Sequence, residues 1–449
     1  MSLAINQNQR NTVLIQIMLL GLLILVLQLP IAQIIWLISD RKETKETARS
    51  SISRLVGGEQ TIEGPILTIP YLKRNATNTP GTSPSESRAV LHVLPELLSI
   101  HGVTETETHY RGIFEIPTYV TKLTIEGKFS LSEVGGLDIL KTDLLLKEAS
   151  LAVGITDPRA IRDQVSLAWD EAQLSFKPGP ASASFLGSGI SSPVTLMEND
   201  KQEYTFSFVL PLGGSSSLHF VPLGRKTVVE LHANWPDPSF SGAYLPTART
   251  VTTDGFEAQW SIPDLGRGFG QLITGSSDPR AILTSSKFGV ELITPVDGHR
   301  MTERAIKYEI LFIFLTFLSF YLFEIFFGLR VHPIQYLLVG GALCLFYLLL
   351  LALSEHLGFA LAYILSSATV VFLVAGYSKS VLRGTRRSTI ILSIMSTLYS
   401  FLFVLLAAQD YSLLIGSLGL TLVLATVMYL TRNVNWYAVA IREPQAGGE

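Results

Sequence analysis

The segment YEILFIFLTFLSFYLFEIFFGL, residues 308–329, decides the fold of this chain, because nearly every residue in it is apolar. A bilayer core of about 30 Å requires about 20 apolar residues for each helical crossing. Comparable apolar segments occupy residues 13–38, 333–353, 357–377, 388–407 and 411–431. The sequence therefore predicts an integral membrane protein with a bundle of six transmembrane helices.

The first apolar segment, residues 13–38, needs separate interpretation because it lies near the N-terminus. It is too long for the apolar region of a signal peptide, and no small-x-small cleavage site follows it. We therefore interpret it as a retained membrane anchor.

The distribution of basic residues predicts the orientation, because short cytoplasmic loops carry an excess of Lys and Arg. The loop at residues 378–387 carries Lys379, Arg383, Arg386 and Arg387. The short loops expected at 354–356 and 409–410 carry no Lys or Arg. Both termini are therefore expected in the cytoplasm and residues 39–307 on the other side. Basic residues directly after the first segment favour the reverse, but long domains translocate largely regardless of their charge.

Residues 39–307 show a period of two rather than a helical period. Apolar and polar residues alternate at 123–131, 204–212 and, more weakly, 227–233, which is typical of strands with one buried face. We expect a mostly antiparallel β domain inserted between the first and second transmembrane helices. Asp157 and Pro158 predict a helix start, residues 75–87 a mobile loop, and residues 215–217 a hairpin tip.

These patterns divide the chain into four expected parts. Residues 1–38 hold an N-terminal tip and the first helix, 39–307 the β-rich domain, 308–431 a five-helix bundle and 432–449 a cytoplasmic tail. A stretch at 179–192 is a candidate boundary between two β subdomains.

Composition excludes several classes of function. The net charge of −3 offers no basic face for nucleic acid. Cys344 is the single cysteine, so no intramolecular disulfide or CxxC pair exists. The sequence has no HExxH, no phosphate-binding glycine loop and no GxSxG. We therefore expect no catalytic residues, no metal ligands and no cofactor.

Several motifs resemble one bacterial family. They are GGEQ at 57–60, RGIF at 111–114, GFEAQW at 255–260, HPIQYLLVG at 332–340 and SEHLGF at 354–359. The chain is similar nearly end to end to the CreD inner-membrane protein family, the cell-envelope integrity or colicin-tolerance family of Gram-negative bacteria. Gly298-His299 departs from the family pattern, which has a tyrosine there. The resemblance implies an inner-membrane location, a large periplasmic domain and a part in envelope integrity or stress response, without a catalytic mechanism.

Glu324 is the sharpest polar residue within the apolar segments. A carboxylate in a membrane helix usually faces a bundle interior or water. One hypothesis is a proton or ligand site shared with Arg330, His332 and Gln335. The alternative is a helix-end acid that reaches the interface or pairs structurally with Arg330 or Arg387.

Two further groups of residues are candidates. Ser354, Glu355 and His356 are expected in a turn between helices, with contact to the periplasmic domain or a pH-sensitive pair as the functional alternatives. In the β region the candidates for a binding surface are Trp235, Phe240, Phe256 and Trp260. The structural alternative is that these rings fill the core of a sandwich.

The leading hypothesis is a non-enzymatic envelope protein whose periplasmic domain binds or senses an envelope component. Its expected partners are the lipid bilayer and an envelope protein, lipid or glycan. The alternative is a transporter or lipid-handling protein that uses a polar site near Glu324. A third hypothesis, an envelope hydrolase, requires a Ser, His or acid cluster in the outer domain.

The predicted orientation can be tested with reporter fusions at Asn75 and Arg386. Alkaline phosphatase, which folds only outside the cytoplasm, is expected to be active at Asn75 and inactive at Arg386. A fluorescent protein that matures only in the cytoplasm should give the opposite result. Phosphatase activity at Arg386 would show that the orientation is reversed.

Overall fold

The computed structural model describes residues 2–75, 85–137, 139–179, 186–197, 201–274, 283–293, 298–327, 329, 331–382, 384–408 and 411–434. The chain divides into two compact units. The helical unit comprises Met1–Thr44 and Val296–Glu449, and the β unit comprises Lys45–Pro295.

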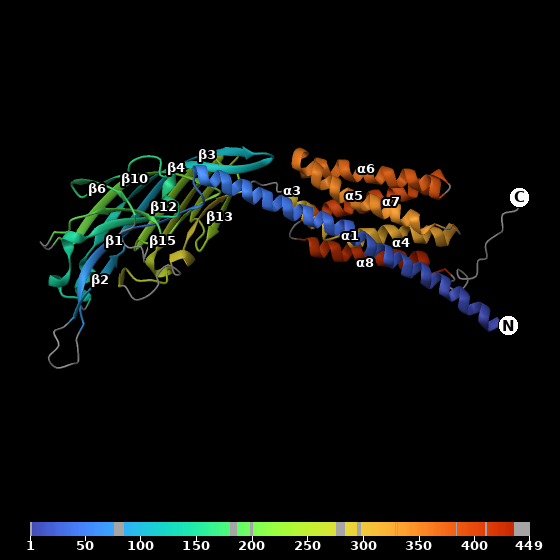
Figure 1. Ribbon diagram of the computed structural model, residues 1–449, viewed down its shortest axis with the longest axis horizontal. Helices are drawn as coiled ribbons and strands as arrows, with labels where there is room; N and C mark the ends of the chain where they lie inside the picture. The colour runs from blue at the N-terminus through green and yellow to red at the C-terminus, as the bar shows by residue number, and fades with distance from the viewer. Residues whose placement is uncertain are drawn as a thin grey trace. The chain divides into compact units, whose positions relative to one another are not determined.

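Six helices are long and apolar enough to span a membrane among the described residues, which confirms the predicted membrane bundle. Figure 1 labels them. They are α1 (Ser2–Val56), α4 (Glu309–Phe327), α5 (Pro333–Leu357), α6 (Phe359–Val381), α7 (Thr385–Ala407) and α8 (Ser412–Thr431). A short helix, α3 (Gly298–Ile306), precedes α4. The charged stretch after the first apolar segment continues α1 as helix to Val56.

Close packing of α5 against α1 and α4 depends on a residue without a side chain. A Cβ atom at Gly340 would lie 2.2 Å from Leu27 Cδ1 and 3.0 Å from the Phe317 ring. Small residues at such contacts let helix backbones approach each other in membranes. The Cys344 thiol donates to the Leu27 carbonyl at 3.9 Å on the same side of α5.

The expected turn at Ser354, Glu355 and His356 is corrected by the structure, because all three belong to the last turn of α5. The connection between the two helices is instead the single residue Gly358, whose φ of 71° favours glycine. α6 then begins at Phe359. The polar residues therefore end a helix rather than connect two.

The β unit consists of two sheets. Among the described residues, one sheet has nine strands: β13 (Pro238–Gly242), β17 (Phe288–Leu292), β11 (Ser217–Phe220), β1 (Gln60–Asn75), β5 (Ser150–Ile155), β9 (Gly189–Pro193) and β8 (Lys177–Pro178) in order, with β2 (Ser85–Val93) on β1 and β16 (Leu272–Thr274) on β2. The second has eight described strands: β14 (Ala248–Thr252), β15 (Gly255–Pro263), β12 (Lys226–Ala233), β3 (Leu97–Arg111), β4 (Phe114–Ser130), β10 (Glu203–Ser215), β6 (Ser166–Trp169) and β7 (Ala172–Ser175). Short 3-10 helices lie at Ser132–Gly136, Lys141–Asp143, Leu146–Glu148, Pro158–Ala160 and Asp264–Gly266.

The predicted alternation matches the buried faces of these strands. Leu123, Ile125 and Phe129 of β4 are fully buried, as are Leu210 and Leu212 of β10. Most pairings are antiparallel, as expected, but β1 with β11 and β3 with β12 are parallel. One hydrophobic cluster runs from Ile62 to Leu292, and β9 at 189–193 contributes Ile190 to it. Described residues on both sides of 179–192 contribute to this cluster, and a subdomain boundary in that stretch stays a prediction.

Three local expectations change. Ser215–Ser217 is not a hairpin tip: β10 and β11 belong to different sheets, and Ser216, with a φ of 67°, lies where the chain crosses between them. Asp157 accepts from the Arg159 N–H at 3.3 Å as predicted for a cap, yet only one 3-10 turn follows it. Residues 85–87 of the expected loop belong to β2, and 76–84 lie outside the described residues.

The long β3–β4 hairpin extends beyond the neighbouring strand β12, and its tip packs on the end of α1 (Figure 1). Phe114 and Ile116 of β4 form a small buried cluster with Ala48 and Ile52 of α1. We call the part of this hairpin beyond Thr104, residues 105–120, the arm. Because its tip is held by apolar contacts, the arm has a fixed position within the β unit.

The buried histidine of β2 predicts a pH dependence of the stability of the β unit. His92 is 4% exposed, its Nδ1 lies 3.2 Å from Thr68 Oγ1, and burial lowers its pKa from 6.5 to about 4. The unfolded chain therefore binds this proton more readily than the folded chain between these pH values. Stability should fall as the pH drops from 6.5 toward 4, by at most about 3 kcal/mol for this group.

Thermal unfolding of the full-length protein, followed by tryptophan fluorescence, measures this effect. The His92→Gln variant keeps a polar partner for Thr68 but cannot gain the proton. Its unfolding temperature should decline less than that of the wild type over the same pH range. Equal declines in the two proteins would show that His92 does not contribute.

Candidate functional site

A groove forms in the β unit where β12 ends before its neighbour does. The parallel pairing of β12 with β3 stops at Ala233 and Thr104, while β3 continues into the arm. Beyond this point the Asn234 side chain supplies a hydrogen-bond acceptor to β3. Its Oδ1 accepts from the Thr106 N–H at 2.7 Å and from the Thr106 hydroxyl at 2.8 Å. The early end of β12 therefore opens a gap beside the arm, while Asn234 still pairs the Thr106 N–H.

The β14–β15 hairpin borders the groove on the other side. Its turn requires a glycine, because a Cβ atom at Gly255 would lie 2.2 Å from the Ala233 carbonyl oxygen. The Thr252 hydroxyl donates to the Gly255 carbonyl at 3.1 Å, which closes the turn. This close approach brings Asp254 and Glu257 to the end of β12.

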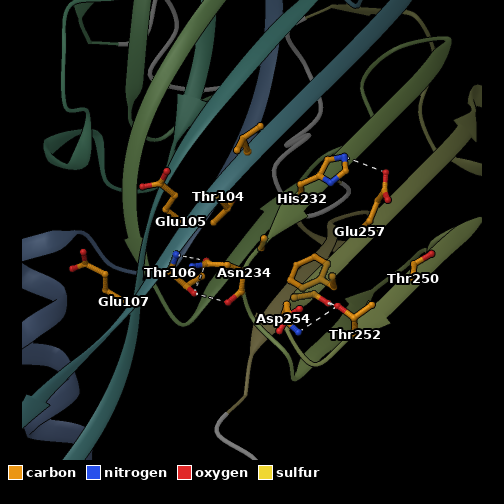
Figure 2. A pocket seen from close by; sticks show the side chains of 14 residues that line it. Thr104, Glu105, Thr106, Glu107, His232, Asn234, Thr250, Thr252, Asp254 and Glu257 are labelled. Carbon is orange, nitrogen blue, oxygen red and sulfur yellow. Dashed lines mark hydrogen bonds and ion pairs between the residues drawn. The ribbon is translucent and has the colours of Figure 1, made fainter.

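The groove has a volume of about 710 Å³ and is strongly acidic. Glu105 and Glu107 lie on the β3 side, and Asp254 and Glu257 on the hairpin side, as Figure 2 shows. His232 Nε2 lies 3.1 Å from Glu257 Oε1. No Lys or Arg is among the described residues that line the groove. Thr104, Thr106, Thr250, Thr252 and Asn234 add hydroxyl and amide groups.

The chemistry of this lining favours a cationic ligand. Several carboxylates of one sign create a negative potential that attracts positive charge. The groove does not form a metal centre: within the described part of the chain, no group of three His, Cys, Asp or Glu side chains could hold a metal ion. An open, polar groove suits an extended ligand that carries amines or guanidinium groups.

The aromatic candidates lie mainly in the core. Trp260 is fully buried and Phe256 is 4% exposed, so neither ring offers a binding surface, although Phe256 lies at the floor of the groove. Phe240 is half-buried and packs edge-on against Trp260 with ring centroids 5.9 Å apart. The Trp235 indole donates to the carbonyls of Asp237 and Ile293 at 3.1 Å. The structural alternative describes these residues better than a recognition surface.

A Ser–His–Glu line lies on the same sheet, next to the groove. His101 Nε2 is 3.2 Å from Ser99 Oγ, and His101 Nδ1 is 3.0 Å from Glu230 Oε2. Acyl transfer also needs backbone N–H groups that stabilise an oxyanion. β3 is paired with β4 on one side and β12 on the other, so its backbone donors serve the sheet. We therefore do not assign hydrolysis to these side chains.

In the helical unit, Glu324 contacts two other helices. Its Oε2 accepts from the Tyr336 hydroxyl of α5 at 3.3 Å, and its Oε1 accepts from the Gln16 amide of α1 at 3.4 Å. His332 and Gln335 do not join it: they form a capping box at the start of α5. His332 Nδ1 accepts from the Ile334 N–H at 3.3 Å, and Gln335 Oε1 accepts from the His332 N–H at 3.0 Å. Arg330 lies outside the described residues.

The candidates at the end of α5 have separate contacts. Glu355 lies 3.5 Å from Arg41 of α1, within the helical unit. The Ser354 hydroxyl donates to the Leu351 carbonyl at 2.9 Å, a bond within the helix. His356 is exposed. The described contacts of these three residues do not form one site.

Sequence reasoning missed both the acidic groove and the buried acid Glu309. The groove residues come from four strands that only the sheet topology brings together. The sequence shows Glu309 as a charged residue in the apolar segment of α4. Its position as the first residue of the helix did not indicate that it is buried.

Comparison with known proteins identifies the family of this chain. A sequence model described as "Inner membrane protein CreD" matches residues 12–437. The chain is also 32% identical over 427 residues to the inner membrane protein CreD of Escherichia coli (strain K12), covering 95% of this chain and 94% of that protein. The chain belongs to the CreD family. Together with the six apolar helices, membership makes it a multi-pass inner membrane protein.

The family name describes a membrane protein rather than an enzyme family. In this CreD-family chain, the geometry of the groove depends on Asn234, which accepts from the Thr106 N–H. Replacing Asn234 with Ala removes the acceptor that holds the Thr106 backbone, at a cost of about 1 kcal/mol. Amide hydrogen exchange at residues 105–107 should then speed up about fivefold, since local opening becomes easier.

Hydrogen exchange of the full-length protein, resolved by mass spectrometry of peptides from the arm, measures this change. Asn234→Asp keeps the Oδ1 acceptor and should leave exchange close to the wild-type rate. Unchanged protection in Asn234→Ala would mean that another contact holds the arm.

Proposed function

We propose that this protein is a non-enzymatic envelope protein whose β unit lies in the periplasm and binds a cationic, extended segment of an envelope component. The observation that carries the proposal is the acidic groove between the arm and the β14–β15 hairpin. The lipid bilayer holds the protein in the inner membrane through its apolar helices.

Charge complementarity supports the class of ligand. Four carboxylates line the groove, from Glu105, Glu107, Asp254 and Glu257, against one histidine. Amines or guanidinium groups on a peptide can each pair with such a carboxylate. The hydroxyl and amide groups of Thr250, Thr252 and Asn234 can bond to the backbone of the same ligand.

The expected affinity is moderate and salt-dependent. The groove is open to water, and an exposed ion pair contributes only about 0.2–1 kcal/mol. The contributions of several pairs add up. Dissolved salt weakens the attraction between exposed charges, with a screening length of about 8 Å at physiological ionic strength. Such an interaction suits reversible recognition of a periplasmic segment.

The proposed orientation rests on the loops of the helical unit. Lys379 lies in the last turn of α6, and Arg386 and Arg387 lie in the first turn of α7. Basic residues at such a short connection favour the cytoplasmic side. The ends of α5 and α7 then face the periplasm, as does the start of α4. Lys45–Pro295 lies in sequence between the apolar stretches of α1 and α4, which supports a periplasmic location of the β unit in this proposed orientation.

Binding can be measured with the full-length protein in nanodiscs of zwitterionic lipid and a fluorescent oligolysine peptide. The double variant Glu105→Gln/Glu107→Gln removes two charges of the groove and should weaken binding about fivefold to tenfold. Raising the salt concentration should weaken binding of the wild type more than that of the variant.

The matched control is Glu115→Gln/Glu126→Gln, which removes two exposed charges of β4 that do not line the groove. This control should change the affinity less than twofold. Equal losses in the two double variants would mean that only diffuse charge attracts the peptide, and the groove would lose its proposed role.

A further inference from the structure

Glu309 is a buried acid in the helical unit that the proposed function does not use. It is the first residue of α4 and only 6% exposed. Its Oε2 atom has no hydrogen-bond partner among the described residues. Little of this carboxylate is therefore exposed to solvent, and one of its oxygens has no described donor.

The groups that interact with Glu309 are all uncharged. Gln28 of α1 is its polar neighbour, and Cys344 and Tyr347 of α5 lie within electrostatic range. The Gln28 amide also donates to the Ile24 carbonyl of its own helix at 3.4 Å, so it does not serve the acid alone. Among the described residues, no Lys, Arg or His forms an ion pair with Glu309. We call Gln28, Glu309, Cys344 and Tyr347 the Glu309 cluster.

Burial of an unpaired charge opposes the ionised form of this acid. An ion removed from water without a partner costs far more than a neutral acid. The start of a helix attracts negative charge, but part of that attraction is lost here. α3 and a turn precede α4 directly, and the Tyr308 N–H donates to the Ala305 carbonyl at 3.2 Å. The dipole of one helix end is a smaller effect than the loss of hydration.

Glu324 of the same helix has more hydrogen-bond donors than Glu309. It accepts from a tyrosine of α5 and a glutamine of α1, and it is only partly buried. Glu309 lies 15 residues earlier, about 22 Å along a straight helix. The same three helices supply a Gln, a Glu and a Tyr to both places, yet only at Glu324 do both carboxylate oxygens have described donors.

We propose that Glu309 is a proton-binding site, at which the side chain is held as a neutral carboxylic acid near neutral pH and exchanges its proton with water. The Glu309 cluster suits a proton better than a metal cation. Sodium requires several oxygen ligands, whereas besides the Glu309 carboxylate this cluster offers only a thiol, a phenol and one amide. The inference is independent of the acidic groove.

Infrared spectroscopy of the full-length protein in nanodiscs detects the proposed state directly. A protonated carboxyl has a carbonyl stretch separate from the carboxylate and amide bands. The wild type should show this band near neutral pH and lose it reversibly as the pH is raised. The band should be absent from Glu309→Gln and retained in the matched variant Glu324→Gln.

Thermal unfolding first establishes that the wild type and Glu309→Gln are both folded. A carboxyl band of equal size in the two folded proteins would then overturn the proposal. Should Glu309→Gln not fold, reaction of the wild type with dicyclohexylcarbodiimide gives a second readout. This apolar reagent modifies protonated carboxyls, so peptide mass spectrometry should find the adduct on Glu309 near neutral pH and severalfold less at alkaline pH.

Absence of the adduct from Glu309 at every pH, together with no titrating carboxyl band in the wild type, would count against a neutral acid. Sodium chloride provides the remaining discrimination, with potassium chloride at equal ionic strength as the control. Protection by sodium alone at constant pH would assign the site to a metal cation and overturn the proton assignment. Equal labelling in both salts supports it.

Discussion

A peptide group in the hydrocarbon core has no water to bond with, so each segment that crosses it must satisfy its own backbone. The helical unit meets this constraint with α1 and α4–α8, whose hydrogen bonds are internal. The same constraint makes side chains costly when they carry charge. It explains why the few acids of this unit stand out, and why Glu324 has neutral donors from two neighbouring helices.

The β unit is governed by a different constraint, the need to pair every strand while covering one core. Two sheets with alternating buried faces achieve this, and Trp260 and Phe256 are used as core rings. Where β12 ends early, the Asn234 side chain supplies the missing acceptor to the arm. The acidic groove is thus a consequence of unequal strand lengths, and its walls are held by the sheet and by α1.

The acidic side chains of the groove and of the Glu309 cluster differ in their exposure to solvent. In the groove, Glu105 and Glu107 are exposed to water, a setting in which carboxylates of one sign create a negative potential. At Glu309, burial removes hydration and favours the neutral form. The same residue type therefore serves electrostatic attraction in one unit and proton binding in the other, as two separate proposals.

The membrane helices, the mainly antiparallel β unit and the family could be predicted from the sequence, because apolar length, period-two alternation and motifs such as HPIQYLLVG at 332–340 are local properties. Which polar residues contact one another depends on the packing of the folded chain. His332 and Gln335 proved to cap a helix, and Ser354 to end one, because hydrogen-bond partners depend on helix boundaries. Glu105 and Asp254 are 149 positions apart in the sequence and line one groove only through sheet pairing. Glu309 is buried at the start of α4, where Gln28 of α1 and Tyr347 of α5 interact with it. Burial and long-range pairing are properties of the packed chain, and no local pattern encodes them.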